Sequence, residues 1–127
     1  MSDRIHWPDG KQFAFTVFDD TDSATLENVA PVYGLLNDLG FRTTKSCWPL
    51  GGDPEKGFNA GQSCEDADYA RWLVDLQSRG FEIAWHNSSW DARPRKDIIT
   101  AFERFATLFH HDPESGANHS DGEALYW

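Results

Sequence analysis

Three aspartates stand close together near the N-terminus, directly after an apolar segment. Residues 13–18 (FAFTVF) lead into Asp19, Asp20 and Asp22. Carboxylates this close repel one another, and proteins usually offset the repulsion with a bound cation or with a pair of shifted pKa values. The chemistry that these residues offer is therefore metal binding, general acid–base catalysis or both. The alternative without chemistry is a solvated loop in which an aspartate caps the next helix.

Two histidines follow later segments that have strand character. His86 ends the segment 81–86 (FEIAWH), and His119 lies in the short segment 117–120. Imidazole nitrogens together with carboxylate oxygens suit Zn²⁺, Mn²⁺, Co²⁺ or Fe²⁺. If these segments end at one place, Asp20, His86 and His119 are candidate metal ligands.

The elements that would position these groups alternate between strand and helix. Segments rich in aromatic and β-branched residues predict a buried first strand and three more, the last of them short: 13–18, 41–48, 81–86 and 117–120. Apolar residues at helical spacing predict three helices, which begin near Asn28, Ser63 and Pro94. The order β-α-β-α-β-α-β is typical of an α/β fold with a parallel sheet, in which right-handed crossovers bring the strand ends to one edge.

The first predicted helix and the second share the way in which they end. Residues 36–41 (LNDLGF) and 76–81 (LQSRGF) stand 40 positions apart, and both place a glycine between a helix and the next strand. In the first helix, the apolar stripe that should face the core consists of Val32, Leu35, Leu36 and Leu39. Repeated strand–helix units of this kind favour the parallel sheet.

Composition limits the classes of function. A chain of 127 residues is long enough for one domain with a core. The net charge of -10 argues against a protein that binds nucleic acid or an anionic membrane, and neutral substrates or cations suit it better. There is no apolar signal segment and no run of ~20 apolar residues, so we expect a cytoplasmic protein without a membrane span. Cys47 and Cys64 lack metal-site spacing, and we expect two reduced thiols.

Two of these segments resemble the motifs of a known family, the polysaccharide deacetylases (the NodB-homology domain, carbohydrate esterase family four). Residues 15–20 (FTVFDD) resemble its first motif, a strand that ends in a double aspartate. Residues 80–89 (GFEIAWHNSS) resemble its second motif, in which a Gly-x-Glu-Ile strand delivers a metal-binding histidine. The resemblance covers essentially the whole chain but only about the first half of the family's domain. It implies a deformed (β/α) barrel, of which residues 1–127 form a single domain truncated at its C-terminus.

The resemblance also implies a chemistry, the metal-dependent removal of N-acetyl or O-acetyl groups from a polysaccharide or a sugar conjugate. By the family's pattern Asp19 is the general base, and Asp20 and His86 bind the metal, which is most often zinc. The family's next histidine falls at Trp90, so one ligand is missing, and we take His119 as its substitute. The late motifs that supply the family's general acid are absent from these 127 residues.

Four further residues complete the candidate site as substrate contacts. Trp48 and Trp90 are predicted at the rim, where an indole ring stacks on a sugar or else anchors a loop. Arg93 is a candidate to orient Asp19, and Asp22 belongs to the same acidic cluster. The expected partner is a carbohydrate.

Two other functions remain open. Asp20 and Asp22 also resemble the Asp-x-Asp opening of haloacid-dehalogenase-type phosphatases, with Asp20 as nucleophile, Asp22 as acid and Mg²⁺ as cofactor; Ala24 stands where that pattern has Thr or Val, and the histidines would be idle. The third possibility is a non-catalytic fragment or a sugar-binding relative. A sheet that ends after its fourth strand exposes an apolar edge, which a C-terminal half or a second copy of the chain would cover.

Overall fold

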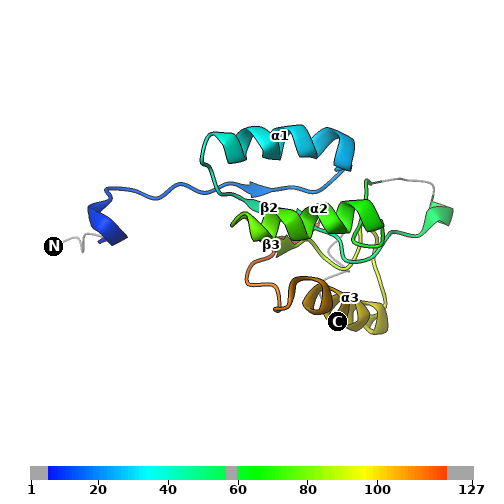
Figure 1. Cartoon of the computed structure of the whole chain (residues 1–127). Coiled ribbons are helices and arrows are strands. Elements are labelled where there is room, and N and C mark those ends of the chain that lie inside the picture. The colour runs from blue at the N-terminus through cyan, green and yellow to red at the C-terminus, as the bar shows by residue number, and fades with distance from the viewer. Residues whose placement is uncertain (1–5, 57–59, 120–127) are drawn as a thin grey trace.

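The structure is a computed structural model that describes residues 6–56 and 60–119. Within these ranges the chain forms three α-helices and an open three-stranded parallel sheet (Figure 1). In chain order the elements are the short 3₁₀ helix η1 (Pro8–Gly10), β1 (Phe18–Asp19), α1 (Leu26–Asp38), β2 (Thr44–Cys47), the 3₁₀ helix η2 (Pro54–Lys56), α2 (Ala67–Ser78), β3 (Glu82–Trp85) and α3 (Arg95–Phe109). The predicted α/β fold class and the parallel sheet are confirmed.

The sheet has the order β1-β2-β3, so β2 is central. The prediction of four strands is wrong for the part of the chain that the structure describes. The segment after α3 does reach the free side of β3, where Gly116 forms an isolated parallel bridge with Trp85. Two backbone bonds hold it there: Trp85 N–H donates to Ser115 O at 3.1 Å, and Ala117 N–H donates to Trp85 O at 3.0 Å. Ser120, the last residue of the predicted strand, lies outside the described residues.

One face of the sheet carries the core. Side chains alternate between the two faces of a strand, and the residues at alternate positions of β2 and β3 that join the core cluster are Cys47, Ile83 and Trp85. All three helices contribute to the same cluster, with Tyr33 from α1, Leu73 and Leu76 from α2, and Phe105 and Phe109 from α3. Cys64 is also a member, and its Sγ lies 3.7 Å from that of Cys47 with both cysteines free, as expected for reduced thiols. No helix in the described ranges is both long and apolar enough to cross a bilayer.

The first predicted strand differs most from the structure. β1 has two residues, and the side chains of Phe13 and Phe15 are 76% and 78% exposed instead of buried. Of the predicted core stripe of α1, Leu36 packs against the core, whereas Val32, Leu35 and Leu39 are 54%, 60% and 63% exposed. An apolar pattern shows which side chains gain from burial, but a partner surface must be present to bury them, and none of the described elements covers this side of α1 and of residues 13–17.

Helix boundaries follow their capping residues. The N-cap of α1 is Thr25, three residues before Asn28, and Asn28 completes a capping box with it as the N3 residue. Gly40 and Gly80 follow α1 and α2 with φ of 76° and 89°, a left-handed conformation that glycine adopts without strain. This confirms the repeated helix–glycine–strand pattern.

The burial of α3 makes a testable prediction about stability. Phe105 is fully buried, whereas Phe102, one turn away, is 41% exposed and stacks on Trp85 with ring centroids 4.1 Å apart. We expect Phe105→Ala to lower the free energy of unfolding by about 3–5 kcal/mol, and Phe102→Ala, the control, by about 1–2 kcal/mol. Urea unfolding followed by circular dichroism measures both, and equal losses would contradict this description of the core.

Candidate metal centre

Strand alternation brings the candidate residues to one side of the sheet. Asp20, Trp48 and His86 each come directly after a residue that faces the helices, so they project to the opposite face at the carboxyl ends of the strands. The preceding residues are Asp19, which is bonded to Tyr33 of α1, and the core residues Cys47 and Trp85. The backbone ladder extends to this point, because His86 N–H donates to Cys47 O at 3.1 Å.

Asp20, Asp22 and His86 form a cluster that has the size of a metal site. His86 Nε2 lies 3.4 Å from Asp20 Oδ1 and 3.6 Å from Asp22 Oδ1, and one ligand atom from each residue lies within 4.8 Å of the others. A zinc ion with tetrahedral bonds of ~2.0–2.1 Å separates its ligand atoms by about 3.4 Å. The two carboxylates are held close by the backbone, since Asp22 N–H donates to Asp20 Oδ1 at 3.1 Å. The two distances from His86 Nε2 to the carboxylate oxygens match this separation of zinc ligands.

His86 provides the strongest sign that a cation belongs here. Its side chain is 4% exposed, and both ring nitrogens are buried without a hydrogen-bond partner among the described residues. Burial lowers the pKa of His86, an effect that the carboxylates of Asp20 and Asp22 oppose only in part. Six other buried side-chain atoms of the described residues also lack a partner, so the sign of a cation is the position of His86 Nε2 opposite two carboxylates and not the missing hydrogen bond alone. A neutral imidazole nitrogen that faces two carboxylates is the donor arrangement that a divalent ion requires.

His119 lies beside this cluster. Its Nε2 is 3.1 Å from Asp22 Oδ2, and its ring is 5.6 Å from the ring of His86. Asp22 thus turns one oxygen to each histidine. Asp22, predicted to contact substrate, lies in the cluster with Asp20 and His86, and His119, predicted as a ligand, contacts the cluster through Asp22; both predicted roles stay predictions. Hydrogen-bond partners of this kind orient the carboxylates that bind metals.

The two tryptophans of the predicted rim have different positions. Trp48 is only 1% exposed, and its ring lies 6.0 Å from that of His86 and 5.9 Å from that of His119. The prediction of a rim position for Trp48 is therefore wrong, because no ring face is left for a sugar; the indole is instead a wall of the cluster. Trp90 remains partly exposed and packs on Gly52, where a Cβ would lie 1.5 Å from Trp90 Nε1. Trp90 keeps the predicted role of a sugar contact as a hypothesis.

Asp19 stands apart from the cluster. Its Oδ2 accepts a hydrogen bond from the Tyr33 hydroxyl at 2.7 Å and pairs with Lys45 Nζ at 3.0 Å. Lys45 is fully buried and also donates to Thr21 Oγ1 at 3.3 Å. Burial and the neighbouring Asp19 carboxylate raise the pKa of Tyr33. Lys45 was not identified from the sequence. The signal was its spacing: residues two apart in a strand lie on the same face, so a lysine two residues before Cys47 faces the core and needs a charged partner.

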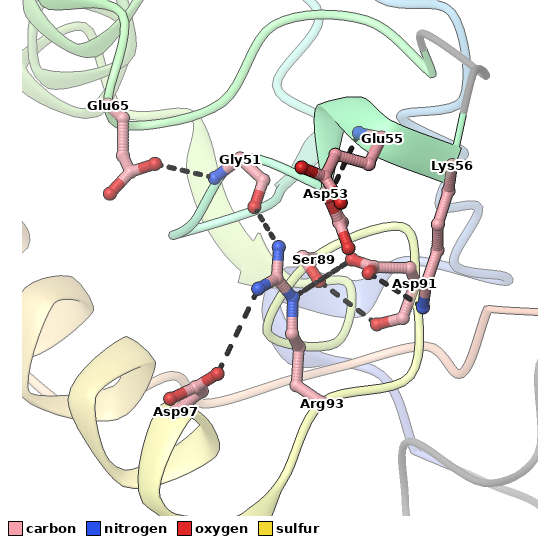
Figure 2. Close-up of polar contacts among 9 residues, drawn as sticks. All are labelled: Gly51, Asp53, Glu55, Lys56, Glu65, Ser89, Asp91, Arg93 and Asp97. Carbon is pink, nitrogen blue, oxygen red and sulfur yellow. Dashed lines mark hydrogen bonds and ion pairs between the residues drawn. The ribbon is translucent and has the colours of Figure 1, made fainter.

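Arg93 does not orient Asp19 as predicted, since it belongs to a second network. Figure 2 shows this network, which is centred on the buried carboxylate of Asp91. Asp91 Oδ1 accepts hydrogen bonds from Arg93 Nε at 2.9 Å and Ser89 Oγ at 2.7 Å, and Lys56 Nζ lies 3.1 Å from Oδ2. Arg93 also donates to Gly51 O at 2.8 Å. The network joins the loop after β2 to the loop after β3, and thereby fixes the two loops that border the strand ends.

Comparison with protein-family models, with curated proteins and with solved structures found no match to this chain. What the centre does chemically therefore rests on its own atoms. These atoms are two carboxylate oxygens and an imidazole nitrogen, a donor set that suits Zn²⁺, Mn²⁺, Co²⁺ or Fe²⁺.

The ligand set predicts a single divalent site. In a competition titration with a chromophoric zinc indicator, we expect the protein to bind one equivalent of Zn²⁺. Asp22→Asn and His86→Ala should each weaken binding by about 100-fold or more, and His119→Gln by about 10–100-fold because it only orients a ligand. Exposed His110 at the end of α3 supplies the control, His110→Asn, which should bind like the wild type. Equal affinity of His86→Ala and the wild type would rule out the site.

The Asp91 network predicts a dependence of stability on pH. Burial alone would raise the pKa of Asp91, but hydrogen bonds from Ser89 and Lys56 and the charge of Arg93 lower it below 3.8. A carboxyl group whose pKa is lower in the folded state stabilises the fold above its unfolded pKa, and the stabilisation is lost as the pH falls through the folded value.

We therefore expect Asp91→Asn to reduce the free energy of unfolding by about 1–3 kcal/mol at pH 7, and the difference from the wild type to shrink below about pH 4. Chemical unfolding at a series of pH values measures it. Asp68→Asn removes an exposed ion pair with Arg71 and should change stability by less than about 0.5 kcal/mol. A difference for Asp91→Asn that persists unchanged at pH 2–3 would contradict the assignment.

Proposed function

We propose that this chain is a metal-dependent hydrolase that removes N-acetyl or O-acetyl groups from a carbohydrate. The observation that carries the proposal is the buried, unpartnered Nε2 of His86, which faces Asp20 and Asp22 at the carboxyl ends of parallel strands. Three protein ligands that leave further coordination positions open are typical of catalytic zinc sites and not of structural ones. The carboxyl edge of a parallel sheet is also where α/β enzymes place their sites.

The acetyl-carbohydrate substrate and the (β/α) barrel come from the resemblance to the polysaccharide deacetylases. Its first two motifs contribute Asp20 and His86, which are two of the three residues in the cluster. The net charge of -10 accords with a neutral sugar and a cationic cofactor. Partly exposed Trp90 is the aromatic surface that remains for contact with a sugar ring.

Each residue of the cluster has a distinct task in this reaction. His86 Nε2 and one oxygen each of Asp20 and Asp22 would hold the ion. When bound, a divalent ion supplies Lewis-acid activation of an acyl carbonyl and of a water molecule. The second oxygen of Asp22 accepts a hydrogen bond from His119 and so keeps the carboxylate in its ligating orientation. Trp48 packs against both histidine rings and excludes water from their buried side.

For the proton acceptor, we propose His119 in place of Asp19. With its Nε2–H donated to Asp22, the His119 imidazole carries its lone pair on Nδ1, which is buried and has no hydrogen-bond partner within the described ranges. A histidine held in one tautomer by a carboxylate is a common general base. Asp19, the base that the resemblance implies, instead has Oδ2 shared between Lys45 and Tyr33 on the helix-covered face.

The hypothesis of a haloacid-dehalogenase-type phosphatase has less support. It assigns no task to His86, the most deeply buried member of the cluster, or to His119. It also needs Asp20 as a nucleophile, whereas Asp20 Oδ1 accepts a hydrogen bond from the backbone of Asp22 and faces His86.

The proposal predicts metal-dependent release of acetate. With Zn²⁺ or Co²⁺ and acetylated oligosaccharides, we expect turnover that is lost in Asp22→Asn and reduced by about 10²–10³-fold in His119→Gln, with His110→Asn unaffected. Acetate released per unit time is measured by a coupled assay, beside the metal affinity of each variant. If Asp19→Asn binds metal normally but is inactive while His119→Gln retains activity, Asp19 is the base. Absence of acetate release with every metal, together with Mg²⁺-dependent hydrolysis of p-nitrophenyl phosphate, would establish the phosphatase reading instead.

A further inference from the structure

The outer edge of β1 offers backbone groups to another strand. β1 stands at the end of the sheet, and no strand within the described ranges pairs with its outer side. Figure 1 shows the preceding residues running out from the sheet along an extended path. Val17 O accepts a hydrogen bond from Thr44 N–H at 3.0 Å, so the peptide groups of Val17 face β2. Because these directions alternate along an extended chain, the peptide groups of Ala14, Thr16 and Phe18 face outward.

Apolar side chains accompany this edge. Phe13, Phe15 and Val17 stand at every second position, share one face of the extended segment and are 76%, 78% and 43% exposed. A cavity of about 210 Å³ connects them with the end of α1, and its lining includes Phe15, Val17, Leu36 and Phe41. Exposed Leu35 and Leu39 stand one and three positions along α1 from Leu36 of the cavity lining. We call this surface, from Phe13 to Leu39 across the cavity, the β1 edge.

Charge on the β1 edge favours a second copy of the same chain as its partner. The chain carries a net charge of -10, so two copies repel each other over most of their surfaces. Residues 10–18 contain no carboxylate and one cation, Lys11. The cavity lining likewise includes Arg42 and no acidic residue. Exposed Asp38 adjoins Leu39 on α1, so the part of the β1 edge at which two of these acidic chains can approach closely is residues 10–18 with the cavity lining.

The area of the β1 edge is that of a stable dimer. Seven large apolar side chains on it are 43–78% exposed: Phe13, Phe15, Val17, Val32, Leu35, Leu39 and Phe41. With roughly 150–200 Å² for each fully exposed side chain, the edge offers on the order of 600–800 Å² of apolar surface. Specific interfaces bury about 800 Å² per partner, and monomers rarely leave so large an apolar patch uncovered.

We propose that two copies of this chain associate through the β1 edge, with residues 12–18 of each copy paired as antiparallel strands about a two-fold axis at Phe15. In this register Phe13 lies opposite the partner's Val17, and Ala14 exchanges backbone hydrogen bonds with the partner's Thr16. The pairing is self-complementary, because apolar residues meet apolar residues on one face and outward peptide groups meet outward peptide groups. It extends each three-stranded sheet across the axis. The metal cluster is not part of this interface.

The test is the mass of the full-length chain in solution, measured by sedimentation over a concentration series. We expect a species of twice 14.4 kDa. Phe15→Lys places a charge at the axis, and Thr16→Pro removes an outward N–H without loss of a bond to β2; each should weaken association by about 30-fold or more. Ile99→Lys, at a 48% exposed position on α3, is the matched control and should dimerise like the wild type.

Hydrogen exchange locates the interface directly. The amides of Ala14, Thr16 and Phe18 should be protected in the dimer and exchange freely on dilution and in Phe15→Lys. A chain that is monomeric up to about 100 μM, a dimer that both substitutions leave unchanged, or the same amides protected in a monomer or in a complex with another polypeptide would each overturn the proposal. Since no metal ligand is altered, these results are independent of the proposed hydrolase activity.

Discussion

Alternation of side chains along three parallel strands is the constraint on which the rest of this structure depends. Trp85 and Cys47 face the helices, so the residues that follow them, His86 and Trp48, face away from the helices at the carboxyl edge of the sheet. The same rule separates Asp19 from Asp20. A register shift of one residue in β3 would turn His86 to the helix side of the sheet, away from Asp20 and Asp22.

Because Asp19 faces one side of the sheet and Asp20 and Asp22 the other, the repulsion among these three carboxylates is offset in two different ways. Asp19 turns to the helix side, where a fully buried lysine and a tyrosine hydroxyl satisfy it. Asp20 and Asp22 remain on the other side and face the imidazole of His86. Lys45 is enclosed by protein and serves the first group only, so the second group has no cation of its own among the described residues. This imbalance is the physical basis for proposing a metal ion at the second group and a structural role for the first.

The loops that follow β2 and β3 are held more firmly than their composition suggests. A loop rich in glycine, proline and aspartate can adopt many backbone conformations. Here the buried Asp91 carboxylate contacts both Lys56 and Arg93, and Arg93 donates to the backbone of Gly51. The sheet itself is closed on one side by the bridge at Gly116 and open on the side of β1. The strand ends are thus held by polar contacts, whereas the outer side of β1 and of residues 13–17 is an exposed apolar edge.

By itself the sequence determined the α/β fold class and indicated two members of the cluster of Asp20, Asp22 and His86, because these depend on local periodicity and on which residue ends a strand. It also indicated that Gly40 and Gly80 end helices, since only glycine adopts their conformation freely. Only the tertiary structure decided the partners of each group: that Lys45 rather than Arg93 pairs with Asp19, that Asp22 lies in one cluster with Asp20 and His86, and that Trp48 is buried. Those outcomes depend on contacts between residues far apart in the chain. The same reason explains why the apolar residues 13–17, which were predicted to form a buried strand, lie exposed. Burial requires a partner surface, and a sequence pattern does not show whether one is present.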